Sequence, residues 1–174
     1  TFFLSTLFAK PPTVLYFLGG VGGGFQIFAL ILLFRFLLPL RTRLTSIFTV
    51  WQRNTLKTVA FLLFIKMGLQ LLTAFPYFAG LAATYLDFTI AYLHWTFLGV
   101  VTISLFLLLD YFKLLIIHRN AYLLYILGFL VTEVLIFYKG WATWRGLAIF
   151  EGYSEVLASG SSLIPLSLLV MVFY

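Results

Sequence analysis

Long apolar runs dominate this 174-residue chain and constrain its fold more than any other feature. Hydrophobic residues make up 63% of the sequence and charged residues only 9%, which is too little charge to cover the surface of a water-soluble domain. A helix that spans a bilayer needs about 20 apolar residues, because the hydrocarbon core is about 30 Å thick. The pattern predicts an all-α, polytopic bundle of transmembrane helices that forms one domain over residues 1–174.

We expect four complete spans and two truncated ones, as in part of a larger bundle. The complete spans cover about 13–40, 58–75, 88–112 and 122–138, and the truncated ones cover Thr1 to Phe8 and 161–174. Because the chain lacks an initiating Met and ends within an apolar run, we expect a processed product or a portion of a longer protein. Residues 140–160 mix aromatic and charged side chains, which predicts a segment that lies in the outer membrane interface.

Positive residues between the spans indicate an orientation. One side of the predicted bundle carries Arg41, Arg43, Arg53, Lys57, Lys113 and Arg119, and the opposite side carries Lys10, Lys139 and Arg145. The positive-inside rule places the richer side in the cytoplasm. We therefore expect a multi-pass protein of the bacterial inner membrane. Its expected partners are the lipid bilayer and other transmembrane helices or subunits of a membrane complex, and not nucleic acid.

Glycine is concentrated at residues 19–24, within the first span. The pairs Gly19/Gly23 and Gly20/Gly24 have the spacing that lets two helices approach backbone to backbone. A phosphate-binding loop needs Lys after its glycines, and Phe25 stands there instead. Helix packing is the better interpretation of this run.

Ionisable side chains within hydrocarbon cost about 2.5–3.5 kcal/mol each on insertion scales, so each one is a functional candidate. Lys66 lies near the middle of its span, and Gln70 follows one turn later on the same face. This polar stripe must face protein or a water-filled cavity, and it serves either as an interhelical hydrogen bond or as a proton or ion path. Arg35 and His118 lie near the basic end, where they can reach lipid headgroups, and Asp110 lies at the inner end of the third span.

His94 and Glu133 lie on consecutive predicted spans, both about 8–9 Å below the outer surface at a rise of 1.5 Å per residue. At this common depth the two side chains could meet. A carboxylate that accepts a hydrogen bond from one imidazole nitrogen orients the other nitrogen toward a metal. The alternative is a polar pair that only joins two helices.

The segment from Phe88 to Gly99 resembles the tenth helix of the catalytic subunit of haem-copper oxidases, especially the cbb-class oxidases and the related nitric oxide reductases. That helix reads much like Thr-Ile-Gly-His-X-His-X-X-X-Leu-Gly, and the matching residues here are Thr89, Ile90, His94, Leu98 and Gly99. The resemblance implies that His94 is the ligand of a low-spin haem iron. It places Tyr92 where the family has the first His of its pair, and it places Arg145 near the loop that approaches the haem propionates.

The leading hypothesis is therefore a membrane protein similar to the C-terminal part of an oxidase-like subunit, which binds haem and takes part in electron transfer within a respiratory-type complex. Independent catalysis is not expected, and an enzyme of this kind would be an oxidoreductase. A non-catalytic structural subunit is the first alternative, favoured by Tyr92 and by the scarcity of polar groups. A transporter or proton-conducting protein that uses Lys66, Gln70 and Glu133 is the second.

Overall fold

The computed structural model describes residues 12–40 and 46–173, and this part of the chain is helical apart from short connections, with no β-strand. Five of its helices are long and apolar enough to cross a membrane, which confirms the predicted all-α transmembrane architecture. The helices are α2 (Thr13–Leu37), α4 (Val50–Leu72), α5 (Pro76–Thr84), α6 (Leu86–His94), η2 (Trp95–Thr102), α7 (Ile103–Tyr111), α8 (Arg119–Arg145) and α9 (Tyr153–Phe173). Helices α6, η2 and α7 follow one another without a break and form the third span, Leu86–Tyr111.

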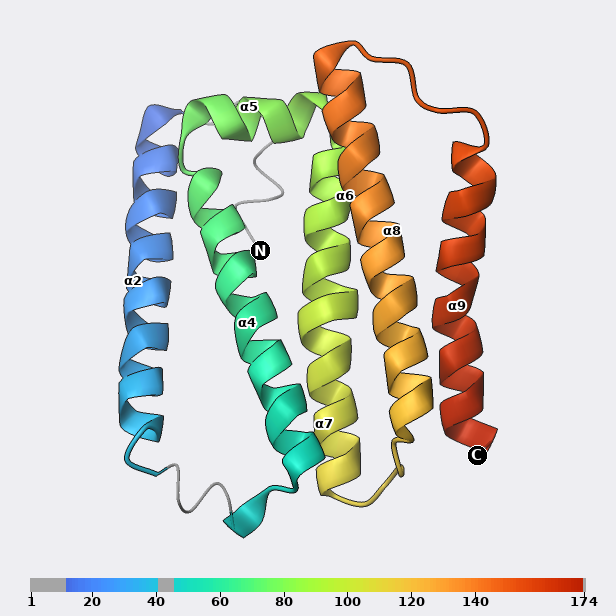
Figure 1. The fold of residues 1–174 in the computed structure, drawn as a ribbon. Helices are drawn as coiled ribbons and strands as arrows, with labels where there is room; N and C mark the ends of the chain where they lie inside the picture. Colours follow the sequence, from blue (N-terminus) through green and yellow to red (C-terminus); the bar gives the residue numbers. More distant parts are fainter. Residues whose placement is uncertain (1–11, 41–45, 174) are drawn as a thin grey trace.

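The five spans stand side by side in chain order and alternate in direction (Figure 1). Helix α2 packs against α4, the third span packs against both α4 and α8, and α8 packs against α9. The short helix α5 runs crosswise at one end and joins α4 to α6 (Figure 1). Because α2 and α9 lie at opposite ends of the row, they present much of their apolar surface outward, as lipid-facing helices do.

Local sequence signals explain where several helices begin and end. Thr49 and Gln52 form a reciprocal capping box at the start of α4, and Pro76 occupies the first turn of α5, where a missing amide donor matters least. Gly146 ends α8 in the left-handed conformation, with a φ of 67°. The turn after α7 requires the same conformation of Lys113, whose φ is 57°.

Two of the expected boundaries differ from the structure. The supposed interfacial segment 140–160 comprises the end of α8, a connection over 146–152 and the first turns of α9. The supposed truncated span 161–174 falls largely within helix α9, which begins at Tyr153 and has 21 described residues. Within 140–160, Trp141, Trp144 and Arg145 belong to the end of α8 and Tyr153 and Glu155 to the start of α9, because amphipathic side chains are tolerated where a span leaves the hydrocarbon.

The second span likewise begins at Val50 rather than near Thr58, so Arg53 and Lys57 lie within α4. The expected outer turn between the second and third spans contains the nine-residue helix α5. The expected N-terminal stump, Lys10, Arg41 and Arg43 lie outside the described residues.

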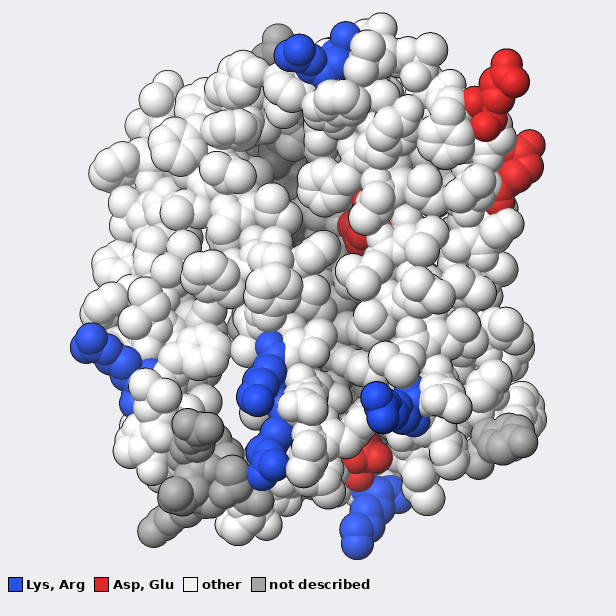
Figure 2. Space-filling view, viewed as in Figure 1, with Lys and Arg blue, Asp and Glu red and all other residues white. Residues whose placement is uncertain are grey.

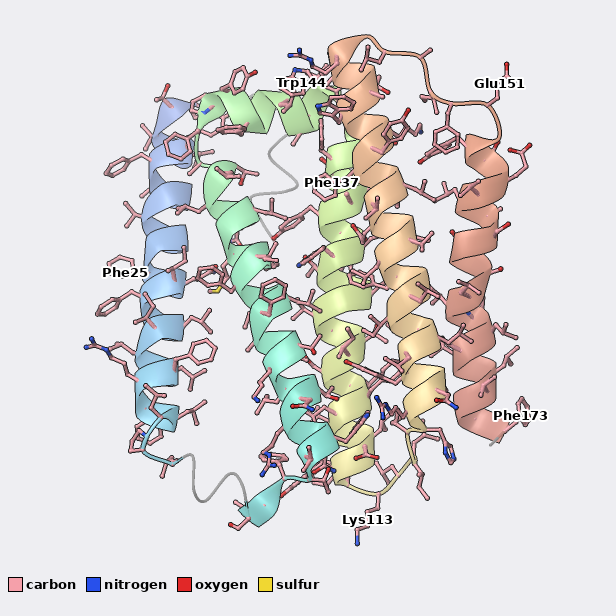
Figure 3. The ribbon with its side chains drawn as sticks, viewed as in Figure 1. Phe25, Lys113, Phe137, Trp144, Glu151 and Phe173 are labelled. Atoms are coloured by element: carbon pink, nitrogen blue, oxygen red, sulfur yellow. The ribbon has the colours of Figure 1, made fainter. Side chains whose placement is uncertain are left out.

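Charge is distributed as a membrane protein requires. On the face shown in Figure 2, most Lys and Arg side chains lie toward the end at which α4 begins and α7 ends, and the broad middle is almost free of charge. Figure 3 shows Lys113 at that end, with Trp144 and Glu151 at the opposite end. Phe25 and Phe173 point away from the bundle, consistent with contact to lipid (Figure 3).

The core lies between α4, the third span, α8 and α9. Its buried members include Leu62, Ile103, Phe106, Tyr125 and Phe129. Asp110 closes the end of this core, because one carboxylate oxygen accepts a hydrogen bond from Gln52 Nε2 at 2.7 Å and the other from the backbone amide of Ile117 at 3.4 Å. Asp110 thus links α4 to the connection between the third span and α8.

Candidate functional site

His94 and Glu133 come together in the structure. His94 is the last residue of α6, Glu133 lies within α8, and His94 Nδ1 is 3.8 Å from Glu133 Oε1. This distance is within reach of an ion pair but longer than a hydrogen bond. The two side chains differ in exposure, because 3% of the Glu133 side chain is exposed and 41% of the His94 side chain.

The polar atoms of this pair lack ordinary partners. His94 Nδ1, Glu133 Oε1 and Glu133 Oε2 are buried and make no hydrogen bond to the described part of the chain. An unpaired buried polar group costs about 1–3 kcal/mol, and most native proteins have few of them. A carboxyl group kept under these conditions within a span is a candidate functional group.

The backbone changes immediately after His94. Residues Trp95–Thr102 form a π-helix, η2, and such wide turns inside α-helices are frequent at functional sites. Neighbouring helices hold it in place: the Tyr125 hydroxyl donates to the Leu98 carbonyl at 2.9 Å, and Trp95 Nε1 donates to the Leu62 carbonyl at 2.9 Å. The wide turn allows Gly99 to lie so close to Phe129 that an added Cβ would be 2.9 Å from the ring. The sequence analysis did not predict η2.

Tyr92 points to the other side of α6. Two residues are about 200° apart around an α-helix, so Tyr92 and His94 face nearly opposite directions. Tyr92 lines a cavity of about 540 Å³ between α2, α4, α5 and α6, to which Phe137 of α8 also contributes, and His94 and Glu133 are not among the residues that line it. The Lys66 ammonium lies 5.9 Å from the centre of the Tyr92 ring, in the geometry of a cation–π contact.

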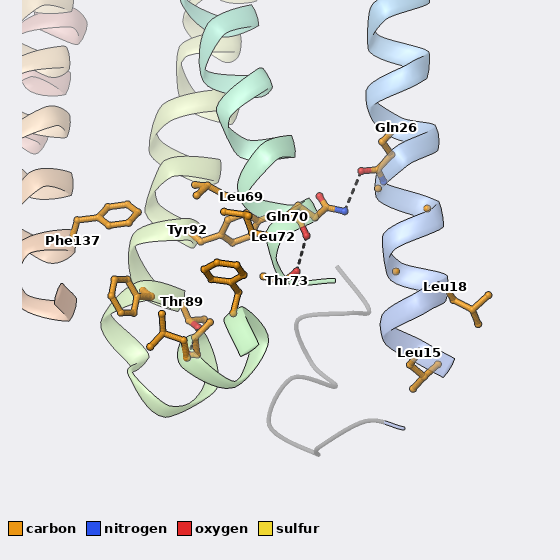
Figure 4. Close-up of a pocket in the computed structure, with 17 residues that line it drawn as sticks. Leu15, Leu18, Gln26, Leu69, Gln70, Leu72, Thr73, Thr89, Tyr92 and Phe137 are labelled. Carbon is orange, nitrogen blue, oxygen red and sulfur yellow. Dashed lines mark hydrogen bonds between the residues drawn. The ribbon is translucent and has the colours of Figure 1, made fainter. Parts of the chain in front are cut away.

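The expected polar stripe extends farther than the sequence indicated. Lys66 Nζ donates a hydrogen bond to Gln70 Oε1, and Gln70 Nε2 donates to Gln26 Oε1 on α2 at 3.1 Å. Gln26, which the sequence analysis did not single out, therefore joins the stripe. Figure 4 shows Gln26 and Gln70 pointing toward one another across the space between α2 and α4.

Arg145 lies apart from the pair. It is the last residue of α8, twelve positions beyond Glu133, which corresponds to about 18 Å along the helix. Its guanidinium lies 5.8 Å from the centre of the Trp144 ring. A closer cation at this end is Lys139, which forms an ion pair with Asp87 at 2.9 Å. The sequence analysis placed Lys139 on the outer side and did not consider this contact.

His94 and Glu133 could supply one protein ligand of a haem and the group that orients it. The imidazole Nδ1 is buried and faces Glu133, which leaves Nε2 as the nitrogen that could bind a metal. A carboxylate beside Nδ1 would orient the imidazole so that Nε2 could bind the iron of a haem. The other histidine, His118, precedes α8 and lies about 22 Å along that helix from Glu133, too far to bind the same iron. In the described residues no three His, Cys, Asp or Glu side chains cluster as a metal site.

These features define the class: the chain is a multi-pass, all-α membrane protein with a half-buried His beside a buried Glu at the start of a π-helix. Comparison with known proteins does not assign the chain to a family within this class, since no family model, curated protein or solved structure matches it.

Proposed function

We propose that this protein binds haem through His94 and takes part in electron transfer within a respiratory-type complex of the bacterial inner membrane. The observation that carries the proposal is the His94–Glu133 pair, with Nδ1 of the imidazole 3.8 Å from a buried carboxylate oxygen. A carboxylate at Nδ1 fixes the ring and makes Nε2 a better ligand. The bound haem supplies a one-electron redox centre.

The partial exposure of His94 supports this assignment. Its side chain is 41% exposed while Nδ1 is buried beside Glu133, so we assign Nε2 to the haem iron, and lipid offers this nitrogen no competing hydrogen-bond partner. Because η2 begins directly after His94, its irregular backbone positions the ring while Tyr125 and Trp95 hold that backbone to α8 and α4. Glu133 is a positioning residue in this scheme, and His94 is the ligand.

The test is a reduced-minus-oxidised visible spectrum with a pyridine haemochrome assay on the full-length protein purified from its membrane. We expect about one haem per chain in the wild type and in His118→Ala, which removes the other histidine. His94→Ala should lose the haem while keeping its helical circular dichroism, and added imidazole should restore the Soret band. An intact wild-type preparation without haem, or a His94→Ala spectrum equal to that of the wild type, would contradict the proposal.

One observation favours a second function, that of a non-catalytic structural subunit. Tyr92, at the position where the oxidase-like helix has its first His, has Lys66 over its ring. Such a contact stabilises the packing of α4 against α6 without any cofactor. A haem-free protein that co-purifies with a membrane complex and whose removal dissociates that complex would support this function instead.

A further inference from the structure

The cavity between α2, α4, α5 and α6 is a second site, separate from the His94–Glu133 pair. Its volume of about 540 Å³ lies within the range of about 300–1,000 Å³ that small-molecule sites occupy. Figure 4 shows residues from α2, α4 and α6 around it. Since neither His94 nor Glu133 lines this cavity, an inference about it does not depend on haem.

Glycines on α2 create the space. Gly19 and Gly22 line the cavity, and a Cβ added to Gly22 would have no atom within 4 Å. Gly20 and Gly23 approach α4, where an added Cβ would lie 3.2 Å from Ala74 Cβ and 3.2 Å from Leu71 Cδ1, respectively. Gly23 also lines the cavity beside this contact. The glycine run therefore does two things: part of it packs against α4, and part of it leaves room beside that contact.

The polar stripe of Lys66, Gln70 and Gln26 determines which groups donate and which accept hydrogen bonds at the cavity wall. Lys66 has only donors, so Gln70 must present its oxygen to Lys66 and its amide NH₂ to Gln26. Gln26 accepts with its oxygen, which leaves its own NH₂ as the last donor of the stripe. Both glutamines line the cavity, and so does Tyr92, whose phenol carries a further hydroxyl donor. The polar side of the cavity thus offers donors to a ligand that carries acceptors.

The remaining walls are apolar and aromatic. Phe78, Phe88, Tyr92 and Phe137 contribute rings, and no described residue that lines the cavity is charged. Aromatic walls favour a flat ligand, and an uncharged wall in a membrane-spanning region favours a neutral one. The cavity therefore favours a ligand that has hydrogen-bond acceptors, is flat and is uncharged. A planar ring with acceptor groups and an apolar tail has these properties.

From this arrangement we infer that the cavity binds a lipid-soluble quinone. The ring carbonyls accept hydrogen bonds from Gln26 and Tyr92, the ring lies among the Phe side chains, and the tail leaves toward lipid. The polar stripe that begins at Lys66 orients the Gln26 amide for this contact.

The experiment uses the full-length protein in lipid nanodiscs and a quinone with a ten-carbon tail, and it follows binding by quenching of tryptophan fluorescence. Gly22→Leu adds a side chain at a position that lines the cavity, and its Cβ meets no atom within 4 Å. Gly24→Leu is the matched control, because its added Cβ also meets nothing within 4 Å but it lies outside this cavity. We expect saturable binding to the wild type and to Gly24→Leu, at least tenfold weaker binding to Gly22→Leu, and binding weakened about three- to tenfold in Gln26→Leu.

Three results would overturn the inference. One is a wild type without saturable binding, and another is equal binding by Gly22→Leu and Gly24→Leu. The third is binding of decanol or decanoate as tight as that of the quinone, because the cavity would then recognise a chain or an anion and not a neutral ring. Haem content measured on the same samples separates a failure here from a failure of the haem proposal.

Discussion

Glu133 Oε1 lies 3.8 Å from His94 Nδ1, and neither atom makes a hydrogen bond to a described residue. The two groups are near enough that a shift of about 1 Å would join them by a hydrogen bond. As placed, they remain two unsatisfied polar groups in the interior of a membrane bundle. Native proteins keep such groups where function requires them, at the expense of stability.

Replacing Glu133 by Leu should therefore stabilise the protein. We expect the free energy of unfolding to rise by about 1–3 kcal/mol, because the substitution removes an unpaired buried carboxyl and keeps an apolar side chain of similar size. Denaturant unfolding followed by circular dichroism measures the change. Thr132→Val is the control, since the Thr132 hydroxyl is buried but donates to the carbonyls of Gly128 and Phe129. A Glu133→Leu protein less stable than Thr132→Val would show that the carboxyl makes stabilising contacts.

The packing of α8 against α9 should depend on two glycines, Gly128 and Gly160, that the sequence analysis did not single out. A Cβ at Gly160 would lie 2.7 Å from Val131 Cγ1, and one at Gly128 would lie 2.9 Å from Leu163 Cβ. We expect Gly160→Leu to destabilise the protein by at least about 1–3 kcal/mol, because the helices must separate to admit the side chain. Thermal unfolding of the protein in detergent measures the loss. Gly24→Leu, which meets open space, should change little, and equal effects of the two substitutions would exclude close packing at Gly160.

The π-helix η2 should loosen when Tyr125 becomes Phe. This substitution keeps the buried ring and removes only the hydroxyl that donates to the Leu98 carbonyl at 2.9 Å. We expect a loss of about 0.5–1.5 kcal/mol and faster amide hydrogen exchange within Trp95–Thr102, measured by mass spectrometry. Tyr77→Phe makes the same chemical change at an exposed position and should leave this exchange unaltered. Unchanged exchange of η2 in Tyr125→Phe would mean that the hydroxyl does not hold the π-helix.

Hydropathy alone predicted the fold class, because each span is a local run of apolar residues whose preference for lipid adds along the sequence. It was weakest at the ends of the spans. At 140–160, charged and aromatic residues interrupt the apolar pattern while the helices α8 and α9 continue into them. Composition cannot separate the end of a long helix from a segment in the interface, because both contain the same residue types.

The candidate site shows the same division. The depth of His94 and Glu133 in the membrane followed from counting residues. The sequence therefore indicated that the two side chains could come into contact, but not that they do. The rotation of each helix about its own axis did not follow from the sequence, and this rotation decides that Tyr92 faces the cavity while His94 faces Glu133. The role of the glycines depends on the same property, since Gly23 meets Leu71 and Gly22 meets open space.

The sequence by itself thus determined that this protein crosses a membrane and where along each span its polar groups lie. Only the tertiary structure decided which groups pair, where α8 and α9 come closest, and that a π-helix follows His94. The physical reason is that hydrophobicity acts residue by residue along the chain, whereas a contact, a cavity or a wide turn depends on which face of a neighbouring helix lies opposite.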